Sequence, residues 1–125
     1  MRLRLLDGRF CVCQVPDFSG ISQYGRVFFL ARTDKECSLV CREDFVPANA
    51  IQQESGWRAL EVVGPLDFSL VGILAGLSGI LAEQGISVFA ISTFDTDYLM
   101  VREGQIDEAI SALEQGGHTI DFLPG

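Results

Sequence analysis

The stretch that decides the fold is GISVFAISTFDTDYLMV, which runs from Gly85 to Val101. It contains two apolar segments, rich in the β-branched and aromatic residues that favour strands, separated by the four residues FDTD, three of which are polar. Aspartate and threonine favour turns, so the stretch predicts a β-hairpin. The tip of this hairpin collects two carboxylates, several hydroxyl groups and an aromatic ring. It is therefore either a solvated turn or part of a binding site.

The hairpin is flanked on each side by one helical and one extended pattern. WRALEVVG reads as a strand, LVGILAGLSGILAEQG as a helix closed by Gly85, QIDEAISALEQGG as an amphipathic helix, and HTIDFL as a final strand. The order β-α-β-β-α-β is the split βαβ, or ferredoxin-like, plan. It predicts an α+β fold in which both helices cover one face of a four-stranded antiparallel sheet.

The N-terminal part of the chain is strand-rich and resembles a worn copy of the same unit. LRLLDGRFCVCQV predicts two strands joined by an Asp-Gly turn, and residues 26–42 predict a second hairpin closed by DKE. A short helical turn starts at Glu43, DFSGISQYG is too short and glycine-bearing for a firm helix, and IQQESG reads as a connection. We therefore expect a degenerate unit over residues 1–53 and a complete unit over residues 57–125.

The bulk composition describes a folded, acidic chain. Of the 125 residues, 48% are hydrophobic and 21% are charged, which is typical of a globular protein. The net charge of −8 and the single lysine, Lys35, argue against nucleic acid and anionic lipid as partners. No apolar run reaches the roughly 20 residues that span a bilayer, and no signal-peptide pattern opens the chain, so we expect a cytoplasmic protein.

Four cysteines lie in the first third of the chain, at Cys11, Cys13, Cys37 and Cys41. Free cysteines are commonly buried as small hydrophobic residues, and this is the interpretation we favour. The C-x-C spacing is tighter than that of the usual zinc knuckle. A redox centre, a disulfide and a metal site stay open as alternatives.

The sequence contains no pattern typical of an enzyme. It lacks G-x-S-x-G, a P-loop and H-E-x-x-H, and its one histidine, His118, has no evident partner. Two aspartates in a turn are a weak signal for Mg²⁺. We therefore expect no catalytic residue, no metal and no cofactor.

Two segments depart from the pattern of an ordinary solvated domain. The predicted helix Leu70–Gln84 carries small residues on the side opposite its apolar stripe, although each interior glycine costs a helix about 1 kcal/mol. The strand Ile86–Thr93 is apolar on both faces, and in the split βαβ plan it lies at the sheet edge, where charges normally deter pairing. The apolar edge strand indicates that another unit continues the sheet. The small residues of the helix are either tolerated surface glycines or a face buried against the N-terminal unit or another subunit.

The run LEVVGPLDFSLVGILAGLSGILAEQGISVFAISTFDTDYLMVREGQIDEAISAL resembles an ACT domain, and the resemblance covers roughly residues 57–122. It is similar to the regulatory domains of aspartate kinases, to the tandem-ACT arginine sensors of eukaryotes, and to small bacterial proteins made of two such units. The resemblance implies that units pair through their edge strands as a homodimer or pseudo-dimer. It also implies that an amino acid binds at the junction between paired units. The arginine sensors have an acidic residue near the position of Leu70, where this chain has none.

The resemblance and the physics of helix ends point to the same candidate ligand site. Unpaired amides at a helix start can receive an α-carboxylate, and an aspartate at the hairpin tip can receive an α-ammonium. Two alternatives stay open: a module for protein interaction or assembly with an unknown target, and a cysteine-based sensor. The candidate ligand-binding residues are Asp67, Phe68, Ser69, Leu70, Val71, Gly72, Ser92, Thr93, Phe94, Asp95 and Asp97.

Overall fold

The computed structural model describes residues 1–63 and 72–122, and the chain divides into two compact units. The C-terminal unit consists of Met1–Asp7 and Arg58–Gly125, and the N-terminal unit consists of Gly8–Trp57. The predicted residues Asp67–Val71 and Pro65 lie outside the described residues. Strand β5, Gln52–Val62, begins in the N-terminal unit and ends in the C-terminal unit.

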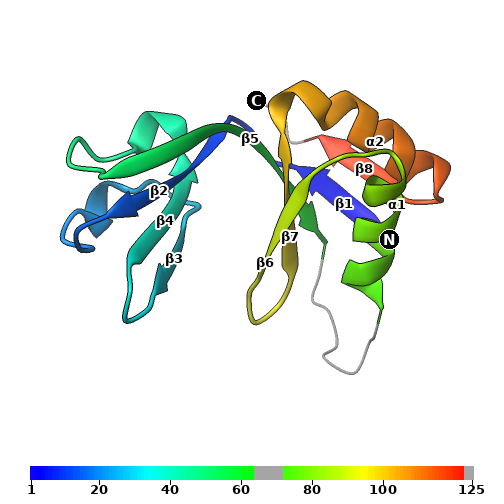
Figure 1. The fold of residues 1–125 in the computed structure, drawn as a ribbon. Coiled ribbons are helices and arrows are strands. Elements are labelled where there is room, and N and C mark those ends of the chain that lie inside the picture. Colours follow the sequence, from blue (N-terminus) through cyan, green and yellow to red (C-terminus); the bar gives the residue numbers. More distant parts are fainter. Residues whose placement is uncertain (64–71, 123–125) are drawn as a thin grey trace. The chain divides into compact units, whose positions relative to one another are not determined.

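The C-terminal unit has the predicted split βαβ plan, and the α+β class is confirmed. Its sheet follows the order β6-β7-β5-β1-β8, in which β6 and β7 form the predicted hairpin. Helices α1 and α2 both pack against one face of this sheet (Figure 1). The elements are β1 (Arg2–Leu5), the second half of β5, α1 (Ile73–Glu83), β6 (Val88–Ser92), β7 (Asp97–Arg102), a 3₁₀ turn (Glu103–Gln105), α2 (Ile106–Gln115) and β8 (Thr119–Phe122).

The first strand of the chain corrects two predictions. Instead of forming a hairpin across the Asp-Gly turn, β1 pairs antiparallel with β5 and parallel with β8. The sheet is therefore mixed and contains one strand more than the expected antiparallel sheet of four. The physical reason is burial: Leu3 and Leu5 join the core beneath the helices, and this long-range packing outweighs the local turn signal. The sequence predicts a single N-terminal unit over residues 1–53, whereas residues 1–7 pack with the C-terminal unit.

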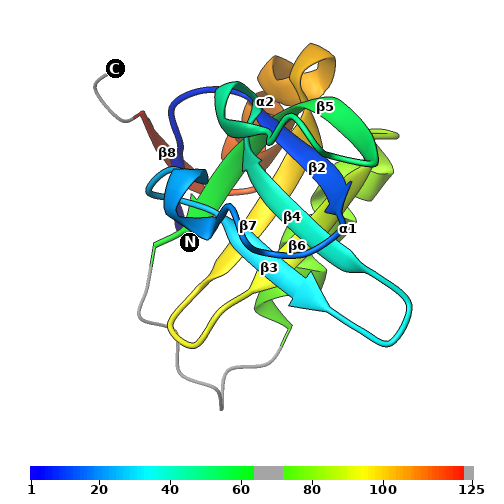
Figure 2. The ribbon, with the colours of Figure 1, turned by 90° about the vertical axis from the view of Figure 1, so that its left-hand side faces the viewer.

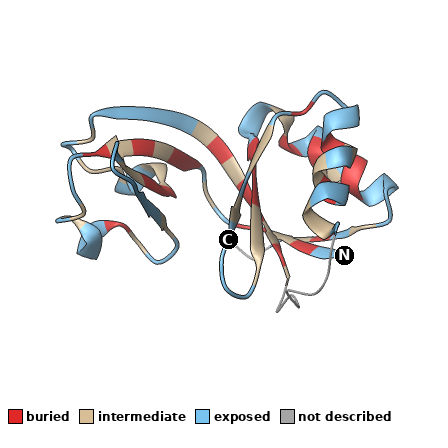
Figure 3. Ribbon diagram, turned by 60° about the horizontal axis from the view of Figure 1, so that its bottom comes forward, coloured by how far each residue is buried: buried red, intermediate tan, exposed pale blue. Residues whose placement is uncertain are grey.

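The helices and the strands of the C-terminal unit share one core. Buried residues alternate with less buried ones along β1, whereas β7 buries three residues in succession, and further buried residues lie on α1 and α2 (Figure 3). Helix α1 begins at Ile73 and not at Leu70, because Gly72 has φ 80°, a left-handed conformation that a helix cannot include. The core residues are Leu3, Leu5, Leu60, Val62, Leu77, Leu81, Ile86, Leu99, Val101, Ile106, Ala109, Leu113 and Ile120.

The N-terminal unit keeps the strand order of the same plan without its α-helices. Its strands pair in the order β3-β4-β2-β5, and Figure 2 shows β2, β3 and β4 side by side. Single 3₁₀ turns occupy the places of the two helices. The sequence predicts a degenerate copy in this part of the chain, and the strand order is compatible with that prediction. The elements are β2 (Phe10–Val15), a 3₁₀ turn (Ile21–Gln23), β3 (Phe29–Arg32), β4 (Cys37–Arg42), a second 3₁₀ turn (Glu43–Phe45) and the first half of β5.

The segment IQQESG was predicted as a connection, and this is wrong. From Gln52 onward it belongs to β5 and pairs with β2. Its side chains from Gln52 to Ser55 are exposed, so the strand has no alternation of apolar and polar residues that could reveal it. Gly56, with φ 88°, accompanies a shift in register between Phe10 and Val12. Such a bulge needs a residue that tolerates positive φ.

None of the helices in the described part of the chain has the length and apolar character needed to span a membrane.

Candidate functional site

The tip of the β6–β7 hairpin is held by its threonines. The backbone amide of Thr93 donates to the carbonyl of Thr96 at 2.8 Å, and the Thr93 hydroxyl donates to the same carbonyl at 3.1 Å. The amide of Thr96 donates back to the Thr93 hydroxyl at 3.4 Å. Backbone and hydroxyl groups therefore close the turn, and the carboxylates of Asp95 and Asp97 take no part in these bonds.

A further contact fixes the tip to the neighbouring strand. The hydroxyl of Thr96 donates to the main-chain carbonyl of Val62, the last residue of β5. Sequence reasoning did not include Thr96 among the site residues. Thr96 is part of the FDTD turn, but its hydrogen-bond partner Val62 is 34 residues away, and no local sequence pattern indicates that contact.

The two aspartates at the tip stand in different environments. Asp95 is exposed in the turn, whereas Asp97 is half-buried and pairs in register with Ser92. Because strand side chains alternate, Asp97 lies on the same face of the sheet as Leu99 and Val101, which pack beneath the helices. Within the described residues, neither Asp95 nor Asp97 forms an ion pair with a basic side chain.

The start of α1 lies at the same end of the C-terminal unit as the hairpin tip (Figure 1). Gly72 is the N-cap residue, and no side chain of residues 1–63 or 72–122 caps the helix. The first amides of an α-helix have no partner within the helix and carry partial positive charge. The structure thus brings Gly72, Ser92, Thr93, Asp95 and Asp97 to one end of the unit.

Phe94 has the most exposed ring among the large hydrophobic side chains of the described residues, at 81%. An exposed aromatic ring beside two carboxylates can cover the apolar part of a small ligand.

A groove of about 410 Å³ occurs elsewhere in the unit, beside the C-terminal end of α1, and does not include the predicted site residues. Its chemistry is polar and acidic. It is lined by Gln84, Asp107, Glu108, Ser111, Ala112 and Gln115.

The cysteines form part of the apolar core of the N-terminal unit. Cys11, Cys13 and Cys41 are buried and all four thiols are free. Burial, reinforced by the neighbouring thiols, raises the pKa of Cys13 to about 11 and that of Cys41 to about 12. These thiols stay protonated at neutral pH, and a protonated thiol is a poor nucleophile and a poor metal ligand. Across residues 1–63 and 72–122, no group of three or more His, Cys, Asp or Glu side chains is arranged to hold a metal ion.

The hairpin turn of the N-terminal unit has the same backbone bonds as the candidate site. There the amide of Thr33 donates to the carbonyl of Glu36 at 2.9 Å, as Thr93 does to Thr96. The amide of Glu36 donates to the Thr33 hydroxyl at 3.3 Å. The two turns therefore share their fold and differ in the side chains that they present.

Sequence comparison gives one family match and a set of partial relatives. A family model described as ACT domain matches residues 52–115. The human protein named cytosolic arginine sensor for mTORC1 subunit 1 is 40% identical over 60 residues, which are 47% of this chain. This chain covers only 18% of that relative's length.

Structure comparison gives neighbours over the whole chain. The protein Atu0741 of Agrobacterium tumefaciens has a TM-score of 0.88 and 28% identity, covering 99% of this chain and 94% of that one. The regulatory subunit of aspartate kinase from Thermus thermophilus has a TM-score of 0.61 and 12% identity, covering 90% and 95% of the two chains. The fold is therefore shared with the regulatory part of an aspartate kinase.

Proposed function

Because this chain belongs to the ACT domain family, we propose that it is a non-catalytic regulatory protein that binds an amino acid at the tip of the β6–β7 hairpin. The observation that carries the proposal is the half-buried Asp97, which has no basic partner among the described residues and lies on the α1 side of the sheet. A carboxylate in that position can receive the α-ammonium group of an amino acid by a charge-assisted hydrogen bond.

The rest of the ligand is recognised by groups that the sequence predicted. The uncapped start of α1, with the segment Asp67–Gly72 that leads into it, receives the α-carboxylate through main-chain amides. Asp95 adds a second carboxylate, and the exposed ring of Phe94 covers the ligand side chain. The names of the relatives, an arginine sensor and an aspartate kinase regulatory subunit, favour an amino acid as the class of ligand.

We propose that a second copy of the chain completes the site. Strand β6 pairs only with β7 among the described strands, and it presents Val88, Phe89 and Ile91 with no charged side chain. An apolar edge of this kind favours pairing with another strand. We therefore expect a homodimer, acting in the cytoplasm on a target protein still to be identified.

The N-terminal unit, in this proposal, is an ACT-like unit that has lost its own ligand site. Its hairpin turn presents Lys35 where the other turn presents Asp95, and its helices are reduced to single 3₁₀ turns. It has neither an α-helix start for a carboxylate nor a tip made of two aspartates.

Thermal melts against the twenty L-amino acids test the proposal. A ligand at about 100 times its Kd stabilises a protein by about 2.7 kcal/mol, which raises the melting temperature by several degrees. Asp97→Ala should abolish this shift. The matched control is Asp34→Ala, because Asp34 lies in the equivalent turn of the N-terminal unit, and it should leave the shift unchanged.

A second candidate function, an assembly module without a ligand, is favoured by the apolar edge of β6. It predicts that no amino acid changes the melting temperature while Ile91→Lys turns a dimer into a monomer in light scattering. A thermal shift that persists unchanged in Asp97→Ala would show that the ligand binds elsewhere.

A further inference from the structure

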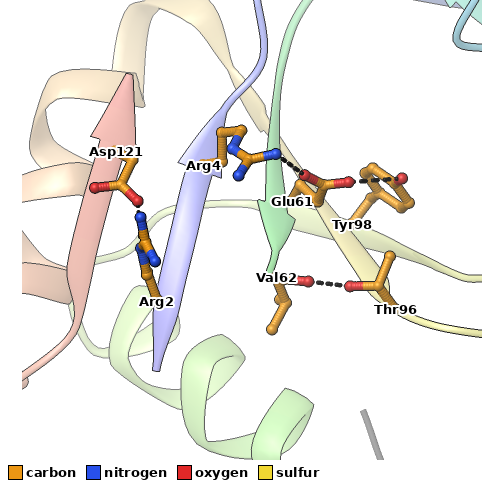
Figure 4. Close-up of polar contacts among 7 residues, drawn as sticks. All are labelled: Arg2, Arg4, Glu61, Val62, Thr96, Tyr98 and Asp121. Carbon is orange, nitrogen blue, oxygen red and sulfur yellow. Dashed lines mark hydrogen bonds and ion pairs between the residues drawn. The ribbon is translucent and has the colours of Figure 1, made fainter. Parts of the chain in front are cut away.

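A polar row crosses three strands on the face of the C-terminal sheet that points away from the helices (Figure 4). At its centre, the carboxylate of Glu61 on β5 accepts from Arg4 Nη1 of β1 at 3.3 Å and from the Tyr98 hydroxyl of β7 at 3.0 Å. Arg4 and Glu61 are also direct partners in the register of β1 and β5. One carboxylate thus connects the N-terminal strand to the strand that begins at Asp97.

The side chains of the row are partly shielded from solvent, so these hydrogen bonds can contribute to local stability. The side chain of Glu61 is 22% exposed and that of Arg4 is 37% exposed. Ion pairs at full exposure contribute little, whereas a carboxylate that accepts two partners at lower exposure contributes more. Burial, followed by the hydrogen bond to Glu61, raises the pKa of Tyr98 to about 12, so the hydroxyl stays protonated and keeps donating.

The residues on either side of Asp97 are both tied to the end of β5. Thr96 donates to the carbonyl of Val62. Tyr98 donates to the side chain of Glu61, which precedes Val62 on β5. Asp97 itself has no such tie in the described residues. Its position at the hairpin tip is therefore set by the strand pairing with Ser92 together with the anchors of its two neighbours.

We propose that Arg4, Glu61 and Tyr98 are positioning residues that fix the hairpin tip, and that through the tip they set the affinity of the ligand site. They touch no ligand and act only through Thr96 and Asp97. The first half of this inference concerns the free protein, and the second half rests on the proposed function.

Amide hydrogen exchange in the free protein tests the first half. Tyr98→Phe and Glu61→Gln should each speed exchange at the Thr93 and Thr96 amides by about 5- to 30-fold, the factor that corresponds to the loss of one or two kcal/mol of local stability. The amides of α2 serve as an internal reference and should not change, which separates local loosening from global unfolding.

The matched control is Asp121→Asn. Asp121 pairs with Arg2 at 2.5 Å, between β8 and β1 on the same face, but touches neither β5 nor β7 through this pair. If Tyr98→Phe and Glu61→Gln leave exchange at the tip equal to that of Asp121→Asn, the row does not position the tip. Equal acceleration in all three variants would likewise overturn the inference, because it would indicate general loosening of the sheet.

The second half is tested with the panel of twenty L-amino acids. The thermal shift seen in the wild type should shrink in Tyr98→Phe and persist in Asp121→Asn, and an undiminished shift in Tyr98→Phe would overturn the link to affinity. If no amino acid shifts the wild type, the proposed function fails, and the exchange measurement still decides whether the row positions the tip.

Discussion

Replacing Leu3 by alanine should destabilise the C-terminal unit far more than the position of Leu3 in the chain suggests. Leu3 is fully buried, and it lies in the core with buried residues of α1, α2 and three other strands, β5, β7 and β8. Strand β1 is also the only link between β5 and β8 in the described sheet. Truncating a fully buried leucine costs about 2 to 5 kcal/mol, because apolar contacts are lost and a cavity remains.

The expected change in melting temperature follows from this cost. For a chain of this size, 1 kcal/mol shifts the melting temperature by roughly 4 °C, so Leu3→Ala should lower it by roughly 8 to 20 °C. Far-ultraviolet circular dichroism is a suitable probe, since both described α-helices belong to the C-terminal unit. Fluorescence of the single tryptophan, Trp57, reports on the N-terminal unit in the same melt.

The control is Phe122→Ala. Phe122 pairs in register with Leu5 on the neighbouring strand, and it is the larger side chain, but it is 63% exposed. Its truncation should therefore cost less than about 1 kcal/mol. If Leu3→Ala and Phe122→Ala lower the circular dichroism midpoint equally, β1 does not belong to the core of this unit and the reasoning is refuted.

Three other predictions follow from glycines and thiols. Gly72→Ala should lower the free energy of unfolding by about 1 to 2 kcal/mol, because its φ of 80° is strained for alanine. Gly76→Ala should raise the free energy of unfolding by about 0.5 to 1 kcal/mol, since an added Cβ meets nothing within 4 Å, and urea melts measure both changes. A disulfide reagent at pH 8 should label Cys37 well before the buried cysteines of the native protein, and equal labelling rates would contradict their burial. The pKa values of Cys13 and Cys41 in the folded protein are raised to about 11 and about 12, so folding favours the protonated thiols. The free energy of unfolding should therefore be constant with respect to these thiols below pH 9 and should fall as the pH rises from 9 towards these values. A melting temperature that does not change over that range would contradict this prediction.

The local patterns of the sequence predicted the C-terminal helices and the central hairpin because each carries its own signal. Helix α2 is amphipathic, and the two apolar strands around FDTD identify β6 and β7 without knowledge of their neighbours. The start of α1 was misplaced, because apolar periodicity continues through residues 70–72 while the backbone of Gly72 is not helical.

Long-range pairing is what local patterns could not supply. The alternation Arg2, Leu3, Arg4, Leu5 predicts a strand with one buried face, but it does not say which strand it joins. The Asp-Gly turn favoured β2 as the partner of this strand. Its actual place, between β5 and β8, is set by burial in a core formed with residues 55 or more positions away. The partners of Thr96 and Tyr98 escaped sequence reasoning for the same reason.

The comparison of the two hairpin turns sharpens what the tip of β6–β7 is for. Thr33 and Thr93 close their turns through the same backbone and hydroxyl bonds, and neither Asp95 nor Asp97 takes part in them. The N-terminal turn follows a strand with exposed side chains and carries Lys35 between acidic residues. The C-terminal turn places Asp95 and Asp97 at the end of the unit where α1 begins uncapped. Since neither carboxylate takes part in the bonds that close the turn, both are available to the proposed ligand.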